Sequence, residues 1–366
     1  MSNKAERRKI DDSTIDKVVS RLNRDFIEGL PGDPKEIATK YARRIVEPYI
    51  SPSINDQLKE MMLEKRLSDE EYVETFLKII YHSFHNKKTS DNPKAYILLS
   101  QTGGGKSNLR ERVLRENPNV VLLDSDSYKK FRPDSTEIQD QYPQYYGALT
   151  GIDCYDHVEN VSNFTMENGY DFLIESAPSI SQGVIGVNTE ELERLGYEIN
   201  YYALAIGDIV SQMAVHKRYE YELRDDILKK SAKLTDIDRH NDSYAAVQLV
   251  LENASPESRI VVFRRGTEEE NQVPQIIESG SDKKSKMDTL ESYRRKSNEE
   301  YLASNSFLED YYLVRKLLLE REAPRTQIVQ LESVSQNARL RGMQLFGDDY
   351  QINIKPVKES RTIEDR

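Results

Sequence analysis

The stretch Ser100-Gln-Thr-Gly-Gly-Gly-Lys-Ser107 decides the fold. It follows the short apolar run Ala95-Tyr-Ile-Leu-Leu99, which is typical of a buried strand, and it precedes a helical pattern over Asn108–Glu116. A strand, a glycine-rich turn and a helix in this order predict a loop whose backbone N–H groups surround phosphates at a helix N-terminus. We therefore predict that this segment binds a nucleoside triphosphate and is not a chance glycine-rich turn.

The side chains of this loop have distinct predicted roles. Lys106 would bridge the β- and γ-phosphates, and the Ser107 hydroxyl would hold Mg²⁺. The usual motif opens with glycine, whereas this loop opens with Ser100, so a residue with a Cβ must make the first turn. The other predicted nucleotide-binding residues are Gln101, Thr102, Gly103, Gly104, Gly105 and Asn108.

Composition limits the classes of function. The 366 residues carry a net charge of −11, which disfavours a nucleic-acid partner held mainly through its phosphates. Cys154 is the only cysteine, so an intrachain disulfide is impossible and a reducing compartment is expected. The chain has no apolar run of about 18 residues and no signal segment at its start. We therefore expect a cytoplasmic protein without a membrane partner.

Three regions follow from the pattern of apolar residues. Residues 1–67 form a helical segment, residues 68–265 alternate between strands and helices, and residues 266–366 form a linker and a helical extension. Apolar strands separated by helices predict an α/β fold, a parallel sheet of the P-loop NTPase type flanked by helices. The predicted strands are 95–100, 120–123, 170–174, 199–205 and 259–263.

Helices are predicted in both outer regions. In residues 1–67, one helix would run from Ile15 to Leu30, a second from Ile37 to Ile45, and a third near residues 54–62. Beyond the linker, long helices are predicted at about 287–318 and 323–343.

Two carboxylates follow the second predicted strand. Asp124 and Asp126 are two residues apart, and on an extended segment both would face the cleft beside the phosphates. A carboxylate there can take the proton of an attacking hydroxyl or help to hold Mg²⁺. The alternative is that one of them caps the next helix. Glu175, at the end of the third strand, is a similar candidate.

One arginine interrupts an apolar helical stripe. Arg218 falls among Val210, Met213, Ala214 and Tyr221, where an aliphatic residue is usual. A guanidinium on the inward side of a helix needs an anionic partner. Phosphate oxygens in the cleft would serve, and a structural carboxylate is the alternative.

Other clusters are weaker candidates. His82 and His85 share a helix face without a third ligand, so zinc is not predicted. Cys154 and His157 lack an orienting third group for nucleophilic catalysis. The tyrosines of residues 141–147 could stack on a base or sugar, but packing within the loop is the commoner outcome.

Together these residues resemble the zeta toxins of bacterial epsilon–zeta toxin–antitoxin systems, which are P-loop kinases of UDP-N-acetylglucosamine and related sugar nucleotides. The resemblance runs from about Ser68 to Phe263 and includes the helix Asp69–Phe76, the phosphate loop, and Leu123-Asp-Ser-Asp-Ser-Tyr-Lys-Lys-Phe-Arg-Pro133. Gly196-Tyr-Glu198 and Lys217-Arg-Tyr-Glu220 also match the family pattern.

The resemblance implies roles for single residues. Asp126 would be the base toward the sugar hydroxyl, Glu159 would bind the sugar, and Arg218 would bind phosphate. Ser125 and Glu175 would be further substrate contacts. The donor would be ATP or GTP with Mg²⁺.

This chain departs from the family pattern in its positive charges. The family places an arginine soon after the strand-three glutamate, and Glu175-Ser-Ala-Pro-Ser179 contains none. Its second phosphate-binding arginine has no clear counterpart, although Lys233 lies near the expected position. Loss of these charges would weaken stabilisation of the transferring phosphoryl group. A slow enzyme or a different acceptor is therefore expected.

We predict an ATP- or GTP-dependent kinase that phosphorylates a nucleotide-sugar hydroxyl and acts as a zeta-type toxin. The alternatives are another hydroxyl acceptor, such as a nucleoside or NAD, and a catalytically weak nucleotide-binding module. A polynucleotide 5′-end is the weakest alternative because the chain is acidic. Family antitoxins are small three-helix proteins that occlude the donor site, so residues 1–67 would be an antitoxin in cis. An added structural subdomain, with any antitoxin acting in trans, is the alternative.

Overall fold

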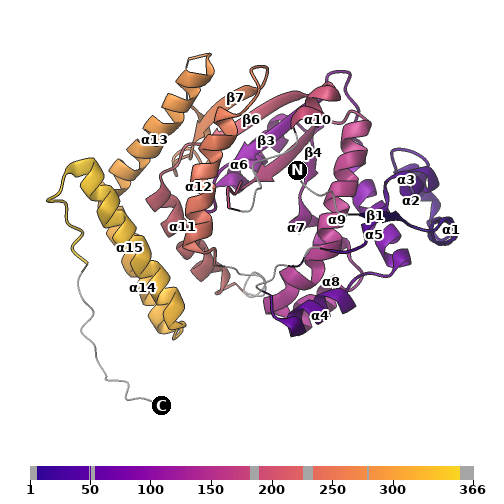
Figure 1. Ribbon diagram of the computed structural model, residues 1–366, viewed down its shortest axis with the longest axis horizontal. Helices are drawn as coiled ribbons and strands as arrows, with labels where there is room; N and C mark the ends of the chain where they lie inside the picture. Colours follow the sequence, from indigo (N-terminus) through magenta and orange to yellow (C-terminus); the bar gives the residue numbers. More distant parts are fainter. Residues whose placement is uncertain are drawn as a thin grey trace.

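A six-stranded sheet forms the centre of the protein, in the order β4-β5-β3-β6-β7-β8. The computed structural model describes residues 6–48, 50, 54–181, 189–225, 234–277 and 280–354. Five strands are parallel and β8 is antiparallel to β7, which confirms the predicted α/β fold (Figure 1). The strands are β3 (Lys94–Leu99), β4 (Val121–Leu123), β5 (Phe172–Ser176), β6 (Glu198–Leu204), β7 (Arg259–Arg264) and β8 (Gln275–Ile276).

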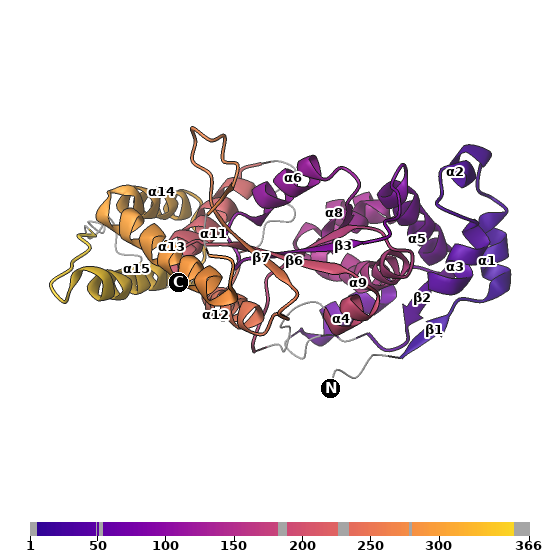
Figure 2. The same cartoon turned by 90° about the horizontal axis from the view of Figure 1, so that it is seen from above.

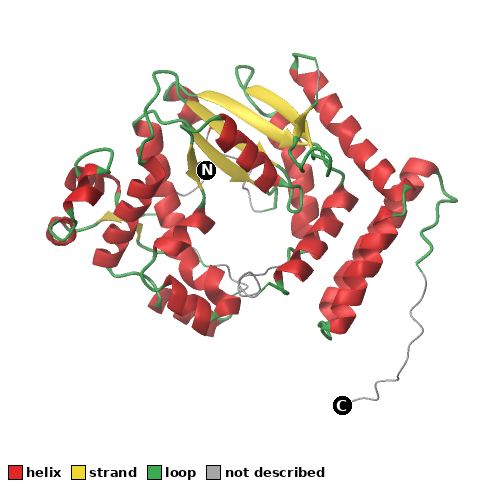
Figure 3. Cartoon of the chain, turned by 180° about the vertical axis from the view of Figure 1, so that it is seen from behind, coloured by secondary structure: helices red, strands yellow, loops and turns green. Residues whose placement is uncertain are grey.

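After Lys94, the central strand β3 carries only buried aliphatic and aromatic side chains, because both faces of the sheet are covered. Along β3, Ile97 and Leu99 enter one hydrophobic cluster, and Tyr96 and Leu98 enter another. Alternate side chains of a strand point to opposite faces, so the two clusters lie on the two sides of the sheet. Figure 3 shows the strands enclosed by helices.

Different helices cover the two faces. The helix α6 (Lys106–Glu116) contributes Leu109 to the cluster of Tyr96 and Leu98. The opposite cluster receives residues from α5 (Asp69–Phe84), α9 (Tyr146–Glu167) and α12 (Ile237–Glu252). The shorter helices of this region are α7 (Ser125–Tyr128), α8 (Ser135–Gln141) and α10 (Thr189–Arg194), with α11 (Asp208–Glu222) following β6.

The N-terminal region is more divided than predicted. The expected helix over residues 15–30 is wrong, because the first helix ends at Val19 and the Asn23 side chain caps a new one by accepting from the Phe26 N–H. The expected second helix stops at Tyr41, because residues 43–45 pair antiparallel with residues 7–9. The elements are β1 (Arg7–Lys9), α1 (Asp12–Val19), α2 (Arg24–Glu28), α3 (Pro34–Tyr41), β2 (Arg43–Ile45) and α4 (Asp56–Glu64).

This region packs directly on the sheet domain. Ile15, Val18 and Ile37 share a hydrophobic cluster with Phe76 of α5 and Val161 of α9. Contacts of α1 and α3 with α5, and of β2 and α4 with α9, continue the interface. The helices α1 and α3 therefore share one apolar core with α5 and α9, whereas Met62 of α4 belongs to a separate cluster with Leu149 of α9.

Three helices follow the sheet at the other end of the molecule: α13 (Lys283–Ala303), α14 (Ser306–Glu320) and α15 (Arg325–Phe346). The first predicted helix of this region is wrong in its length, because it breaks at Ser304 and Asn305. The predicted linker also contains β8. Figure 2 shows α14 and α15 at the opposite end from α1–α3. Among the described helices, none combines the length and apolar character needed to cross a bilayer.

Candidate phosphoryl-transfer site

The glycine-rich loop joins the carboxyl end of β3 to the start of α6. Gly103 has φ +73°, and a Cβ there would lie 2.2 Å from the Ser211 carbonyl oxygen, so only glycine fits. A Cβ on Gly104 would lie 1.8 Å from the Ser100 Oγ. The serine at the opening position is therefore accommodated because Gly104 has no side chain.

Lys106 lies folded against this loop. Its Nζ donates to the Ser100 carbonyl oxygen at 2.8 Å and to the Gln101 carbonyl oxygen at 3.1 Å. Neither acceptor carries a full charge, so the buried ammonium group is held by dipoles. Burial lowers the pKa of Lys106 to about 8.

Other cations act on the same lysine. Apart from burial, the charges of Arg218 and Arg239 lower the pKa of Lys106, and Glu175 opposes them. Glu175 is itself engaged by Arg110 of α6, whose Nη1 lies 3.1 Å from its Oε1. Burial raises the pKa of Glu175, against the effects of Arg110 and Lys106. Positive charge therefore exceeds negative charge around the loop, as expected where phosphates bind.

The remaining loop side chains have varied surroundings. Gln101 is buried and donates to the Ile206 carbonyl oxygen and to the Ser211 Oγ at 2.9 Å, so its side chain anchors the loop to α11. Within the described part of the chain, Thr102 Oγ1 is buried and has no hydrogen-bond partner. Asn108 donates to the Gln272 carbonyl oxygen.

Of the two remaining predicted phosphate- and metal-binding residues, the structure describes Ser107 but not Lys233. Ser107 is the second residue of α6, directly after Lys106. Lys233 lies outside the described residues.

The prediction that Asp124 and Asp126 share one extended segment is wrong. The helix α7 begins at Ser125, and Asp124 caps it by accepting from the Asp126 N–H at 3.0 Å. Asp126 is 79% exposed and pairs with Lys129 at 2.5 Å. The strong N-cap preference of aspartate explains the early helix start. The charge of Asp124 contributes to the raised pKa of Glu175, so Asp124 acts on the same carboxylate as Arg110 and Lys106.

Glu159 projects from α9 and is half exposed. Arg7 of the N-terminal strand β1 places its Nη2 2.6 Å from the Glu159 Oε2 and 3.0 Å from the buried Asp156 Oδ1. The residue that the family resemblance assigns to the sugar is thus paired with the N-terminal region.

The prediction that Arg218 lies on the inward side of its helix is wrong. Its side chain is 52% exposed and lies 3.4 Å from Glu222. The buried face of α11 carries Ile209 and Met213, which pack with residues of α14 and α15. The C-terminal helices therefore turn Arg218 away from the core, while its charge still acts on Lys106.

Two arginines near the loop escaped sequence reasoning. Arg265, just after β7, donates from Nη2 to the Gly103 carbonyl oxygen at 2.6 Å. Arg239 of α12 donates to the carbonyl oxygens of Ala177 and Pro178. Arg265 comes just after a predicted strand, as Asp124 does, so the same sequence signal could have identified it. Nothing in the local sequence places Arg239, since its partners lie about sixty residues earlier.

The weaker candidates from the sequence find structural explanations. Burial raises the pKa of the Cys154 thiol to about 12 and lowers that of His157 to about 3, which leaves both groups neutral and opposes a nucleophilic pair. Tyr142, Tyr145 and Tyr146 pack against a hydrophobic cluster. No group of three or more His, Cys, Asp or Glu residues suited to a metal occurs in the described ranges.

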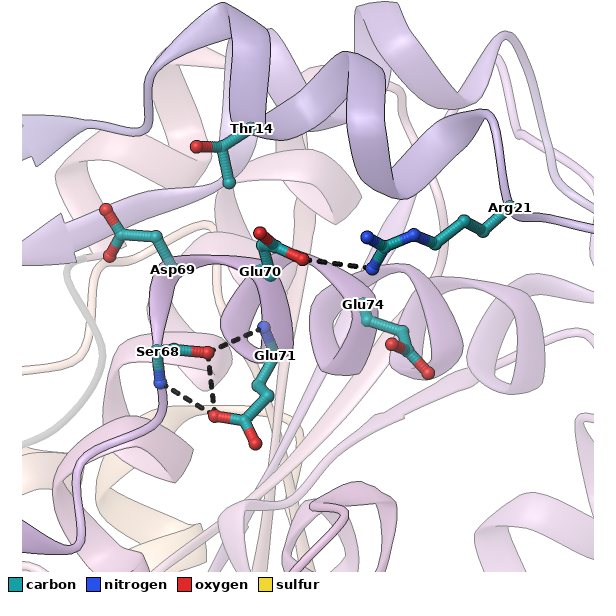
Figure 4. Close-up of a pocket in the computed structure, with 7 residues that line it drawn as sticks. All are labelled: Thr14, Arg21, Ser68, Asp69, Glu70, Glu71 and Glu74. Atoms are coloured by element: carbon teal, nitrogen blue, oxygen red, sulfur yellow. Dashed lines mark hydrogen bonds and ion pairs between the residues drawn. The ribbon is translucent and has the colours of Figure 1, made fainter.

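A separate polar pocket lies where α1 meets α5 (Figure 4). Glu71 and Ser68 form the capping box of α5, and Arg21 pairs with Glu70. These side chains bond to one another, so the pocket is explained by the docking of α1. Its lining residues are Thr14, Arg21, Ser68, Asp69, Glu70, Glu71 and Glu74.

Comparison with known proteins agrees with this arrangement. A family model described as Zeta toxin matches residues 81–271, more than half of the chain. The chain belongs to the zeta toxin family. The matched range includes the phosphate loop, Asp126, Glu159, Glu175 and Arg218.

Individual relatives carry the same name. Toxin zeta of Enterococcus hirae is 30% identical over 176 residues, which are 45% of this chain and 54% of that protein. Toxin zeta of Streptococcus pyogenes is 30% identical over 149 residues, covering 38% of this chain and 49% of that protein. The chain therefore spans about half the length of the curated relatives it matches.

A solved structure shares the fold. It comes from work on the PezAT chromosomal toxin-antitoxin system of Streptococcus pneumoniae, with a TM-score of 0.53 and 20% identity. The match covers 70% of this chain and 98% of that chain. At this identity the likeness concerns the fold alone.

Proposed function

We propose that this protein transfers the γ-phosphoryl group of ATP or GTP to a hydroxyl of a nucleotide sugar such as UDP-N-acetylglucosamine. The observation that carries the proposal is the position of Lys106, buried in a glycine-rich loop and subject to the charges of Arg218 and Arg239. Such an excess of positive charge matches a triphosphate. Membership of the zeta toxin family supports both the reaction and a role as a toxin.

The loop has the features needed for a nucleotide with Mg²⁺. The backbone at Gly103 and Gly104 packs closely within the loop and against α11, because a Cβ at either position would collide with a neighbouring atom. Loops of this kind can direct their N–H groups at phosphates. Ser107 would hold the metal with the phosphates, and Glu175 lies near enough to Lys106 to raise its pKa. Bound Mg²⁺ would neutralise charge on the phosphate oxygens.

In the proposed reaction, the acceptor oxygen forms a bond to the γ-phosphorus as the bond to the β–γ bridging oxygen breaks. Asp126 takes the acceptor proton, which requires it to separate from Lys129. Glu159 orients the sugar, and ADP or GDP leaves with the bridging oxygen. Another hydroxyl compound, such as a nucleoside or NAD, is the alternative acceptor.

The direct test is release of ADP by the full-length chain with and without acceptor. We expect turnover that depends on UDP-N-acetylglucosamine or a related nucleotide sugar, and a phosphorylated sugar detected by mass spectrometry. Parallel reactions with a nucleoside and with NAD distinguish the alternatives. Tight ATP binding without turnover on any of these acceptors would leave only the nucleotide-binding module.

We further propose that the N-terminal region restrains the kinase in cis. Its helices pack on α5 and α9, at the far end from α14 and α15 (Figure 1). The specific contact is Arg7 with Glu159, so the restraint proposed here acts on the acceptor side. This differs from occlusion of the donor site, which the family resemblance suggests for a separate antitoxin.

Substitution of Arg7 tests this restraint. Arg7→Gln keeps a hydrogen-bond donor for Asp156 but removes the charge that holds Glu159, so we expect the KM for the acceptor to fall about two- to fivefold, as suits a partly exposed ion pair. Arg8→Gln is the matched control, because Arg8 lies on the same strand and pairs with Asp69. An unchanged KM in Arg7→Gln, or an equal fall in both variants, would contradict restraint through Glu159.

A point substitution is preferable to removal of residues 1–67. Arg44 and Arg66 lie 3.4 and 3.6 Å from the buried Asp153, and Arg7 pairs with the buried Asp156. Truncation would leave both carboxylates with fewer partners, and breaking a buried pair costs about 3–5 kcal/mol. Loss of activity after truncation would then report unfolding.

A further inference from the structure

Arg239 lies in an unusual position for an arginine. It is the third residue of α12, whose N-cap is Asp236. The N-terminus of a helix carries partial positive charge and favours anionic side chains there. A guanidinium in the first turn therefore contributes nothing to the helix through its charge.

The hydrogen-bond acceptors of Arg239 are uncharged carbonyl oxygens, and its charge also helps to lower the pKa of the nearby Asp242. Its Nη2 donates to the Ala177 carbonyl oxygen at 2.7 Å and its Nη1 to the Pro178 carbonyl oxygen at 3.1 Å. Among the described residues it forms no ion pair with a carboxylate. A guanidinium has five N–H donors, so three remain after these two bonds.

The segment that Arg239 holds lies directly after β5, beside Glu175. Parallel strands end on the same edge of a sheet, where ligands of such folds bind. The phosphate loop leaves this edge from the neighbouring strand β3. Arg239 also acts electrostatically on Lys106. Its guanidinium thus lies at the phosphate site, and no ion pair within the described ranges occupies it.

We propose that Arg239 contacts the γ-phosphoryl group of the bound nucleotide and supplies the positive charge that the segment Glu175–Ser179 lacks. Its two carbonyl contacts fix the plane of the guanidinium, and the remaining N–H groups bind phosphate oxygens. This inference rests on the proposed function, because it requires a triphosphate in the loop. It assigns a role to a residue that lies outside the family motifs quoted above.

Nucleotide affinities test this contact without any acceptor. In the full-length chain we compare a non-hydrolysable ATP analogue with ADP, using calorimetry in the presence of Mg²⁺. Arg239→Gln keeps one donor for the carbonyls but removes the charge, so we expect at least about tenfold weaker binding of the ATP analogue. ADP affinity should change by less than about twofold, because ADP lacks the contacted group.

Two further variants separate the charge from the structural bonds. Arg239→Lys keeps the charge and should retain most of the preference for the triphosphate. Asp242→Ala is the matched control, because Asp242 accepts from the Ser181 N–H at 3.1 Å and bonds Ser179, and so holds the same segment without positive charge. We expect its affinity for the ATP analogue to be no weaker than that of the wild type.

Four results would overturn the inference. Equal loss of ADP and ATP-analogue affinity in Arg239→Gln would assign Arg239 a structural role, as would the same loss in Asp242→Ala. Unchanged affinities in Arg239→Gln would exclude the phosphate contact. Failure of the wild type to bind either nucleotide would overturn the proposed function as well, which distinguishes the two failures.

Discussion

Lys106→Met should abolish phosphoryl transfer, with a fall in kcat/KM of at least about 10³-fold. Methionine has a similar length but cannot place a positive charge against the phosphates. In the wild type the Lys106 Nζ donates to two backbone carbonyls and to no other described residue, and it can exchange these acceptors for phosphate oxygens. The measurement is steady-state release of ADP with the preferred acceptor, together with the Kd of an ATP analogue.

Lys106→Met should also lose the pH dependence of its affinity for the ATP analogue. Because burial lowers the pKa of Lys106 to about 8, the free protein carries the charge below that pH and loses it above. Binding of phosphate favours the charged form, so wild-type affinity for the ATP analogue should fall as the pH rises through 8. Lys106→Met should bind weakly at every pH between 6.5 and 9.5, a range of about three units around that pKa.

The unfolding temperature of Lys106→Met distinguishes a loss of phosphate binding from misfolding. A lysine whose folded pKa lies below its unfolded value makes the unfolded chain bind more protons between those two pH values, so it lowers stability at neutral pH. Lys106→Met should therefore unfold at a temperature no lower than the wild type. Activity in Lys106→Met within tenfold of the wild type would contradict the assigned role of the loop.

The sheet could be predicted from sequence because its strands are buried on both sides. Five apolar runs correspond to β3–β7, and the glycine-rich loop identified the order of strand, turn and helix at β3. The start of α5 was also predictable, since Ser68 and Glu71 form a capping box over three residues. These features depend on neighbours in the sequence.

The errors concern features that depend on distant partners. The strand at residues 43–45 forms by pairing with residues 7–9, which no local periodicity reveals. The apolar stripe around Arg218 suggested an inward position, but α14 and α15 cover the other face of α11. For the same reason the pairing of Arg7 with Glu159 and the position of Arg239 emerged only from the structure.

Asp126→Asn should lower kcat about 10²- to 10⁴-fold, the range typical of a lost general base. Asparagine has the same shape and can still accept a hydrogen bond, but it cannot take the acceptor proton. Asp126 is exposed and pairs with Lys129 rather than with the phosphate loop, so nucleotide affinity should stay within about twofold of the wild type. Single-turnover ADP release and calorimetry measure the two quantities separately.

Asp124→Asn is the matched control for this assignment. Asp124 caps α7 and contributes to the raised pKa of Glu175, so it is the other carboxylate at the end of β4. An asparagine side chain caps a helix nearly as well as aspartate, and Asp124→Asn should therefore keep the fold. If kcat falls in Asp124→Asn and not in Asp126→Asn, the general base is Asp124. Asp126 then keeps its ion pair with Lys129 during turnover. If only Asp126→Asn is impaired, the ion pair with Lys129 must open during turnover.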